Sequence, residues 1–280
     1  MYNQDSKTRK MYKIEHDDLP KLLIEIDNIA RTAGLEILEI YKTDFSVANK
    51  EDNSPLTAAD TAAHKVICQS LSQLTPNIPV LSEESSHIDF SERKKWKQYW
   101  LVDPLDGTRE FIKKNDEFTV NIALIDGHQS VLGVVHIPVI DTSYMATINN
   151  GAHRRNKQNE IEKISVRKIN KNSITVAGSR SHGNQKQKSF ISKIKNVEVL
   201  SVGSSKKFCL VAEGKADIYP RFGPTSEWDT AAAQCIVEES GGKVVDENLN
   251  VLEYNTKDSL VNPSFLVIAD TSFNWNQFVS

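Results

Sequence analysis

The apolar positions along the 280-residue chain predict helices that alternate with short strands. Over residues 22–40 apolar side chains recur at steps of three and four, which is one face of a long helix. Residues 44–56 are typical of a loop or short hairpin, and a second helix with the same period is expected over 57–75. Residues 1–18 are polar, so we expect them to be frayed.

Further along, short apolar runs predict strands and longer periodic segments predict helices. Strands are expected at 80–81, 99–102, 118–125, 131–137, 144–148, 173–177, 197–202, 243–246 and 265–269, and helices from Gly107 and at 186–195, 204–213 and 229–240. The turn residues Asp126-Gly127 favour antiparallel pairing of the strands that they join. Polar residues dominate 149–163, a candidate boundary. We therefore expect a layered α/β fold: an N-terminal α+β sub-domain (1–155) with the metal-binding motifs, and a C-terminal α/β sub-domain (156–280) with the substrate pocket.

Charge and cysteine usage exclude several classes of protein. The chain has 34 basic and 37 acidic residues, so it lacks the basic surface of a protein that binds nucleic-acid polymers. Three widely spaced cysteines argue against a disulfide framework and favour a reducing, cytoplasmic location. No apolar run has the length of a membrane helix, which leaves peripheral attachment to a membrane open. A monomer and a homodimer are both compatible with the sequence.

Acidic residues stand at the ends of predicted elements, where α/β proteins place ligands. They are Glu83, Asp103, Asp106 and Asp229. Carboxylate oxygens suit magnesium or calcium better than zinc. Pro104 prevents a regular helix between Asp103 and Asp106, so both carboxylates and the Leu105 carbonyl can point to one place.

Each of these carboxylates also has a structural interpretation. Taken singly, Asp106 and Asp229 are more often helix caps than metal ligands. The pair Glu83-Glu84 is typical of a solvated surface, and Asp103-Pro104 of an ordinary turn. The combination is more specific than its parts, but spacing alone leaves both interpretations open.

The segment after Asp106 adds a candidate phosphate site. If a helix starts there, the backbone N–H groups of Gly107, Thr108 and Arg109 can hold a phosphate. Earlier in the chain, the segment 57–60 matches a capping box with Asp60 at the third helical position. That role does not prevent Asp60 from also accepting a proton from the Thr108 hydroxyl.

Four blocks of sequence, taken together, resemble the inositol monophosphatase superfamily of lithium-sensitive, magnesium-dependent phosphatases. They are Asn53-Ser-Pro-Leu-Thr-Ala-Ala-Asp60, Leu81-Ser-Glu-Glu-Ser85, Trp100-Leu-Val-Asp-Pro-Leu-Asp-Gly-Thr108 and Glu227-Trp-Asp-Thr-Ala-Ala232. The resemblance implies a five-layer αβαβα sandwich. One departure is Ser82, which stands where many relatives have glycine.

The resemblance also implies roles for the acidic residues. Glu83, Asp103 and the Leu105 carbonyl would hold one magnesium ion, and Asp103, Asp106 and Asp229 a second, with two or three ions per site in total. Thr108, backed by Asp60, would orient the attacking water, so that Asp60, Thr108 and Glu83 form the catalytic set. Residues that would contact the substrate phosphate are Glu83, Leu105, Asp106, Gly107, Thr108 and Asp229.

Within the superfamily, several stretches are most similar to the bacterial 3′(2′),5′-bisphosphate nucleotidases. They are Arg109-Glu-Phe-Ile112, 178–182, 203–214 and 219–224. This implies hydrolysis of 3′-phosphoadenosine 5′-phosphate to AMP and phosphate in sulfate assimilation, and possible cleavage of the 5′-phosphosulfate analogue. By resemblance, the nucleotide-pocket candidates are Ser179, Arg180, Ser204, Lys207 and Arg221.

Three alternatives stay open at this point. Lys207 and Arg221 have ordinary surface charge as their structural interpretation. An inositol monophosphatase or a related sugar phosphatase would share the chemistry but not the pocket. A nucleotide or metal sensor would bind without turnover, although the complete set of acidic residues disfavours it.

Overall fold

The computed structural model describes residues 13–43, 48–49, 55–56, 58–179 and 185–278, and its first half is built on a seven-stranded sheet. In spatial order the strands are β3 (Val80–Ser82), β4 (Gln98–Asp106), β5 (Thr119–Asp126), β6 (Gln129–Ile137), β7 (Thr142–Thr147), β8 (Ala152–Arg155) and β9 (Ile161–Ile164). Only β3 and β4 pair in parallel; the later pairs are antiparallel. The central strands are buried on both faces, which explains their continuous apolar runs.

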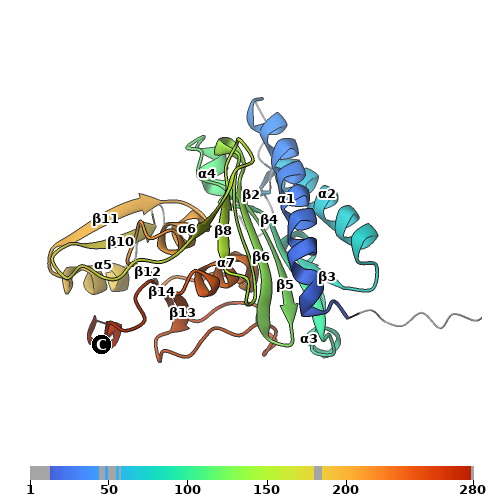
Figure 1. Cartoon of the computed structure of the whole chain (residues 1–280). Helices are drawn as coiled ribbons and strands as arrows, with labels where there is room; N and C mark the ends of the chain where they lie inside the picture. Colours follow the sequence, from blue (N-terminus) through green and yellow to red (C-terminus); the bar gives the residue numbers. More distant parts are fainter. Residues whose placement is uncertain (1–12, 44–47, 50–54, 57, 180–184, 279–280) are drawn as a thin grey trace, which may run out of the picture.

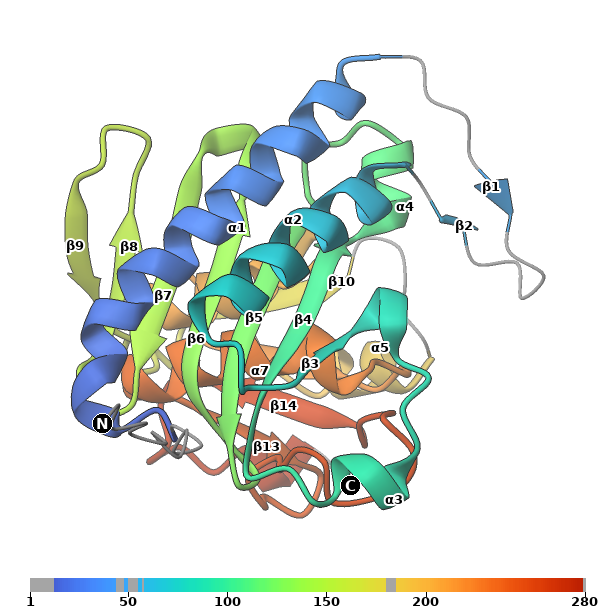
Figure 2. The same cartoon turned by 90° about the vertical axis from the view of Figure 1, so that its right-hand side faces the viewer.

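Two helices cover one face of this sheet, as Figure 2 shows. They are α1 (Leu19–Tyr41) and α2 (Ala58–Leu74). The buried residues of α1 follow the predicted period, and Ala30, Ala33 and Gly34 keep its contact surface small. A side chain at Gly34 would place its Cβ 2.8 Å from His136 on β6, so α1 lies close against the strands. Before α2, β1 (Ala48–Asn49) pairs antiparallel with β2 (Pro55–Leu56), which fits the short hairpin, one of the two forms expected for 44–56.

A second, five-stranded sheet carries the C-terminal half. In spatial order its strands are β11 (Val197–Val202), β10 (Ile174–Ser179), β12 (Ile218–Arg221), β14 (Phe265–Ile268) and β13 (Lys243–Asp246). Between the two sheets lie α6 (Lys206–Ala212) and α7 (Glu227–Glu239), whose apolar side chains share one cluster with both sheets. The outer face of the second sheet packs on α5 (Gln185–Ser192) and η4 (Trp275–Phe278).

The layers therefore run helix, sheet, helix, sheet, helix, as Figure 1 shows, and the predicted αβαβα order is confirmed. The middle helix layer is tightly packed. A Cβ added to Gly133 on β6 would lie 2.1 Å from the Ala232 carbonyl oxygen of α7. This contact sets the depth of α7, the helix that carries Asp229. None of the described helices combines the length and apolar character that crossing a membrane requires.

Some elements differ from the sequence-based prediction. The polar segment 149–163 forms the β8–β9 hairpin, whose side chains are mostly exposed and therefore show no apolar run. The sheet changes between β9 and β10, whereas the boundary expected after residue 155 falls inside that hairpin. Strand β12 was not predicted, because Pro220 interrupts a short run. Helix α7 begins at Glu227, two residues before the predicted start.

Candidate active site

Separate elements place acidic side chains at one point beside the ends of β3 and β4. Ligand oxygens of Asp103, Asp106 and Asp229 all lie within 4.8 Å of one another. Glu83, in the turn after β3, and Asp60, in the first turn of α2, are close enough for their charges to act on this group. The structure thus brings together the acidic residues singled out in the sequence.

The irregular end of β4 explains how two nearby carboxylates can face the same place. The register of β4 against β5 shifts between Asp103 and Asp106, across Pro104. Within this bend the Leu105 amide donates to Asp103 Oδ1 at 3.1 Å, and the Thr108 hydroxyl lies 3.3 Å from the Leu105 carbonyl oxygen. Gly107 then adopts a left-handed conformation, with φ of 93°, which favours glycine.

Gly107 also settles the alternative role of Asp106. The short helix α4 (Thr108–Ile112) has Gly107, not Asp106, as its N-cap residue. Asp106 Oδ2 instead accepts hydrogen bonds from the second half of the chain, from the Ser205 amide and, at 2.7 Å, from the Ser205 hydroxyl. The capping interpretation of Asp106 is therefore wrong. Ser205 was missed by the sequence reasoning, although it follows Ser204 in a stretch that had been singled out.

For Asp229 the capping interpretation is correct, but it is incomplete. Ser226 is the N-cap of α7, and Asp229, at the third helical position, accepts the Ser226 amide at 2.8 Å in a capping box. Its carboxyl group belongs to the acidic cluster at the same time. The capping box expected at 57–60 includes Thr57, which lies outside the described residues.

The cluster is electrostatically unfavourable in the absence of a cation. Burial, followed by the charge of Glu83, raises the pKa of Asp103 well above its usual range. Glu83 as a whole residue is exposed, but its carboxyl group is surrounded by protein. This burial, followed by the charges of Asp229 and Asp60, raises the pKa of Glu83 to about 8. Burial and the charge of Asp106 raise the pKa of Asp229 to about 7. Crowded, mutually repelling oxygen ligands of this kind fit a hard divalent cation.

Two cationic side chains from the second half lie near the cluster. Lys207 is buried, with 5% of its surface exposed. Its Nζ donates to the Ser204 carbonyl at 2.6 Å and also lies over the Tyr219 ring, 5.2 Å from the ring centroid. Its interpretation as an ordinary surface charge is therefore wrong. Arg221 ends β12, and its charge acts on Asp229.

The other pocket candidates in the described part of the chain lie at the ends of β10 and β12 and just before α6. Ser179 is the last residue of β10, and Arg180 lies outside the described residues. Ser204 adopts a positive φ of 47° immediately before α6. Arg221 donates from Nη2 to the Pro224 carbonyl at 3.0 Å, while its buried Nε has no hydrogen-bond partner among the described residues.

Comparison with known proteins agrees with this arrangement. The Inositol monophosphatase family matches residues 19–274 of the chain. The chain belongs to this family. Among curated relatives, the 3′(2′),5′-bisphosphate nucleotidase CysQ of Escherichia coli is 45% identical over 248 residues, which are 88% of this chain and 99% of that protein. The CysQ of Haemophilus influenzae is 39% identical over 91% of this chain and 95% of its own length.

Solved structures give the same result. CysQ from Bacteroides thetaiotaomicron superposes with a TM-score of 0.79 at 41% identity, covering 89% of this chain and 97% of that one. An inositol monophosphatase from Anabaena has a TM-score of 0.74 at 22% identity, covering 94% and 95%, which supports the fold alone. The predicted superfamily and the predicted resemblance to bisphosphate nucleotidases are confirmed. Enzymes of this family depend on metal ions, in keeping with the acidic cluster.

Proposed function

We propose that the chain is a magnesium-dependent 3′(2′),5′-bisphosphate nucleotidase that hydrolyses 3′-phosphoadenosine 5′-phosphate to AMP and phosphate. The observation that carries the proposal is the acidic cluster next to the buried Lys207, in a chain 45% identical to enzymes of that name. The 5′-phosphosulfate analogue has the same 3′-phosphate and is proposed as a second substrate. Both nucleotides belong to sulfate assimilation.

The metal-binding residues are proposed from the donors present. Glu83, Asp103 and the Leu105 carbonyl would hold one magnesium ion, and Asp103, Asp106 and Asp229 a second. When bound, such ions lower the pKa of water and neutralise charge on a phosphate and its leaving oxygen. The raised pKa values of the carboxyl groups support this assignment, because a divalent cation offsets both the burial and the mutual repulsion that raise them.

The chain's own proton-transfer groups are Thr108 and Asp60. The 3.3 Å separation of the Thr108 hydroxyl from the Leu105 carbonyl is long for an O–H···O bond, so the hydroxyl can rotate at little cost. We propose that Thr108 Oγ1 orients the attacking water and that the buried Asp60 carboxylate accepts the proton through Thr108. The backbone N–H groups of Gly107 and Thr108, at the start of α4, would hold the phosphoryl oxygens.

The second phosphate distinguishes this substrate from an inositol monophosphate. Ser204, Lys207 and Arg221 are proposed to bind the 5′-phosphate, with Ser179 and Arg180 contributing to the nucleotide pocket. A buried ammonium group such as that of Lys207 is stabilised by an anionic partner, and a phosphate can supply one.

Cys68, Cys209 and Cys235 are unpaired, which supports a reducing, cytoplasmic location.

A substrate panel tests the proposal directly. Phosphate release by the purified protein is measured with 3′-phosphoadenosine 5′-phosphate, its 5′-phosphosulfate analogue, inositol monophosphate and fructose bisphosphate, each with magnesium and with EDTA. The adenosine bisphosphate should give the highest kcat/KM, and EDTA should abolish turnover. Lithium should inhibit if the metal site behaves as the family resemblance implies. A preference for inositol monophosphate would overturn the proposed substrate and favour the inositol phosphatase alternative.

A further inference from the structure

We propose that Ser205 is a positioning residue that fixes the Asp106 carboxylate for cation binding, with Asn121 orienting the Ser205 hydroxyl. The inference rests on the proposed function only in assuming that the acidic cluster binds divalent cations. Ser205 lies directly before α6, in the second half of the chain, whereas Asp106 ends β4 in the first. The contact therefore joins the two halves at the metal-binding group itself.

Among the described residues, the hydrogen bonds to Asp106 are all on one oxygen. Oδ2 accepts the Ser205 amide, the Ser205 hydroxyl at 2.7 Å and the Thr119 hydroxyl at 3.3 Å. A carboxylate held by donors on one oxygen cannot rotate freely, and its other oxygen, Oδ1, remains for a cation. Groups that orient a metal ligand in this way commonly change metal affinity by about 10- to 100-fold when they are removed.

The Ser205 hydroxyl is itself held in place. Ser205 is 2% exposed, and its Oγ accepts a hydrogen bond from Asn121 Nδ2 at 2.9 Å. The Asp229 carbonyl oxygen also lies 2.9 Å from this Oγ, but a hydroxyl has a single proton to donate. The Asp106 carboxylate is charged and lies closer to Oγ, at 2.7 Å, so it is the stronger acceptor of the hydroxyl proton. Asn121 pairs with Asp103 in the β4–β5 ladder, so this chain of contacts links the strands of the cluster to α6.

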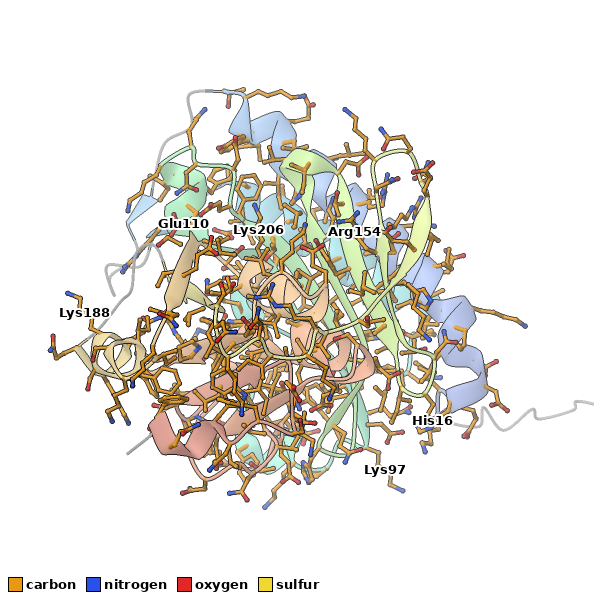
Figure 3. All side chains as sticks on the ribbon, turned by 60° about the vertical axis from the view of Figure 1, so that its left-hand side comes forward. His16, Lys97, Glu110, Arg154, Lys188 and Lys206 are labelled. Atoms are coloured by element: carbon orange, nitrogen blue, oxygen red, sulfur yellow. The ribbon has the colours of Figure 1, made fainter. Side chains whose placement is uncertain are left out.

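The turn that carries Ser205 is packed closely against Glu110 and Glu117. The Gly203 amide donates to Glu117 Oε2 at 2.8 Å, and a Cβ at Gly203 would lie 2.7 Å from Glu110 Cγ. Ser204, the next residue after Gly203, has a positive φ of 47°. Figure 3 labels Glu110 on α4 and Lys206, the first residue of α6. Because Gly203 is hydrogen-bonded to Glu117 and packed against Glu110, the Ser205 donors two residues further on act on Asp106 as a rigid support.

A direct binding measurement tests the role of Ser205 without relying on turnover. Mn²⁺ is titrated into the full-length protein without nucleotide, and the free ion is followed by electron paramagnetic resonance. Ser205→Ala keeps the backbone donor but removes the hydroxyl, so we expect affinity to fall by roughly tenfold. The matched control is Ser240→Ala, because Ser240 is also buried but donates to Val237 at the far end of α7. The control should bind Mn²⁺ like the wild type.

A double-mutant cycle separates positioning from general damage. If Ser205 acts through the Asp106 carboxylate, then Ser205→Ala should cause little further loss of Mn²⁺ affinity in an Asp106→Asn background. Should Ser205→Ala fail to fold by circular dichroism, Asn121→Ala decides instead, with an expected loss of roughly threefold. Wild-type affinity in the folded single variant, or fully additive losses in the cycle, would overturn the proposal.

The same titration distinguishes this inference from the proposed function. If the wild-type protein hydrolyses no bisphosphate nucleotide but Ser205→Ala still weakens Mn²⁺ binding, the function fails and the positioning role stands. If the nucleotide is hydrolysed and Ser205→Ala binds Mn²⁺ as tightly as wild type, the function stands and the positioning role fails.

Discussion

Asp229 Oδ2 accepts the backbone amide of Ser226 at 2.8 Å while the Asp229 carboxyl group lies in the acidic cluster. One side chain therefore completes the capping box of α7 and contributes to the candidate metal site. The two roles have different requirements. Capping needs an oxygen acceptor, whereas cation binding also needs negative charge, so an amide substitution can separate them.

The first prediction concerns Asp229→Asn and Ser226→Ala. Asp229→Asn keeps an acceptor for the Ser226 amide, so the metal-free protein should lose less than about 1 kcal/mol of stability, while phosphate release falls by about 100-fold or more. Ser226→Ala removes the cap hydroxyl and should cost about 1 kcal/mol with most activity kept. Urea denaturation in EDTA and phosphate release with magnesium measure the two effects. Equal loss of activity in both variants would contradict the separation.

The second prediction is a pH dependence of stability in the metal-free protein. Glu83 and Asp229 have pKa values raised to about 8 and about 7, and that of Asp103 is raised as well. These groups bind protons more tightly in the folded than in the unfolded chain, where carboxyl pKa values are about 4. Their contribution to stability is therefore present at low pH and is lost as the pH rises through about 5 to 8.

Magnesium should reverse that trend, because binding displaces protons from the carboxyl groups and becomes tighter as pH rises. Thermal denaturation across this range, in EDTA and in magnesium, checks the sign. Asp103→Asn serves as the comparison: it removes one repelling carboxylate, so at pH 8 without metal it should be more stable than wild type by roughly 1–2 kcal/mol. It should also lose nearly all turnover. A metal-free wild-type protein that gains stability between pH 5 and 8 would show that other groups dominate.

The strongly periodic elements and the acidic ends of strands could be predicted from the sequence. The α1 face and the continuous apolar runs of β4 to β6 are dictated by burial, which leaves a direct mark on residue type. Acidic residues at the ends of predicted elements were expected to converge, and Asp103 and Asp106 of β4 and Asp229 of α7 do so.

Features that depend on contacts between distant segments produce no pattern in the local sequence from which they could be predicted. The β8–β9 hairpin is polar because it lies at the edge of the sheet, so its composition indicates a linker. The burial of Lys207 depends on β12 and on the turn before α6, and a lysine by itself indicates the surface. Ser205 donates to Asp106 across 99 residues of chain, a relationship that no local pattern contains.

The third prediction tests Lys207 as a ligand of the 5′-phosphate. Lys207→Met keeps the length and much of the volume of the side chain but removes its charge. We expect KM for 3′-phosphoadenosine 5′-phosphate to rise by about tenfold or more, with a smaller change in kcat, because the binding contact lies away from the bond that is cleaved.

Adenosine 3′-phosphate, which lacks the 5′ group, is the control substrate and should be affected little. Burial lowers the pKa of Lys207 to about 8, so the wild-type KM for the bisphosphate should rise above that pH and the variant's should not. Equal losses on both substrates would assign Lys207 to the support of the Ser204 turn instead.

The fourth prediction concerns the contact that sets the depth of α7. A Cβ at position 133 would lie 2.1 Å from the Ala232 carbonyl oxygen and 2.8 Å from the Ala232 carbonyl carbon, both of which are backbone atoms that cannot rotate away. Gly133→Ala should therefore displace α7 and cost about 3 kcal/mol or more.

Gly127→Ala is the control: it has open space around the added methyl group but a φ of +63°, so it should cost only about 1–2 kcal/mol. Urea denaturation measures both losses, and Mn²⁺ affinity, measured where each variant is folded, should fall for Gly133→Ala alone because only that variant moves Asp229. Comparable stability in the two variants would mean that the helix layer can shift without disturbing the cluster.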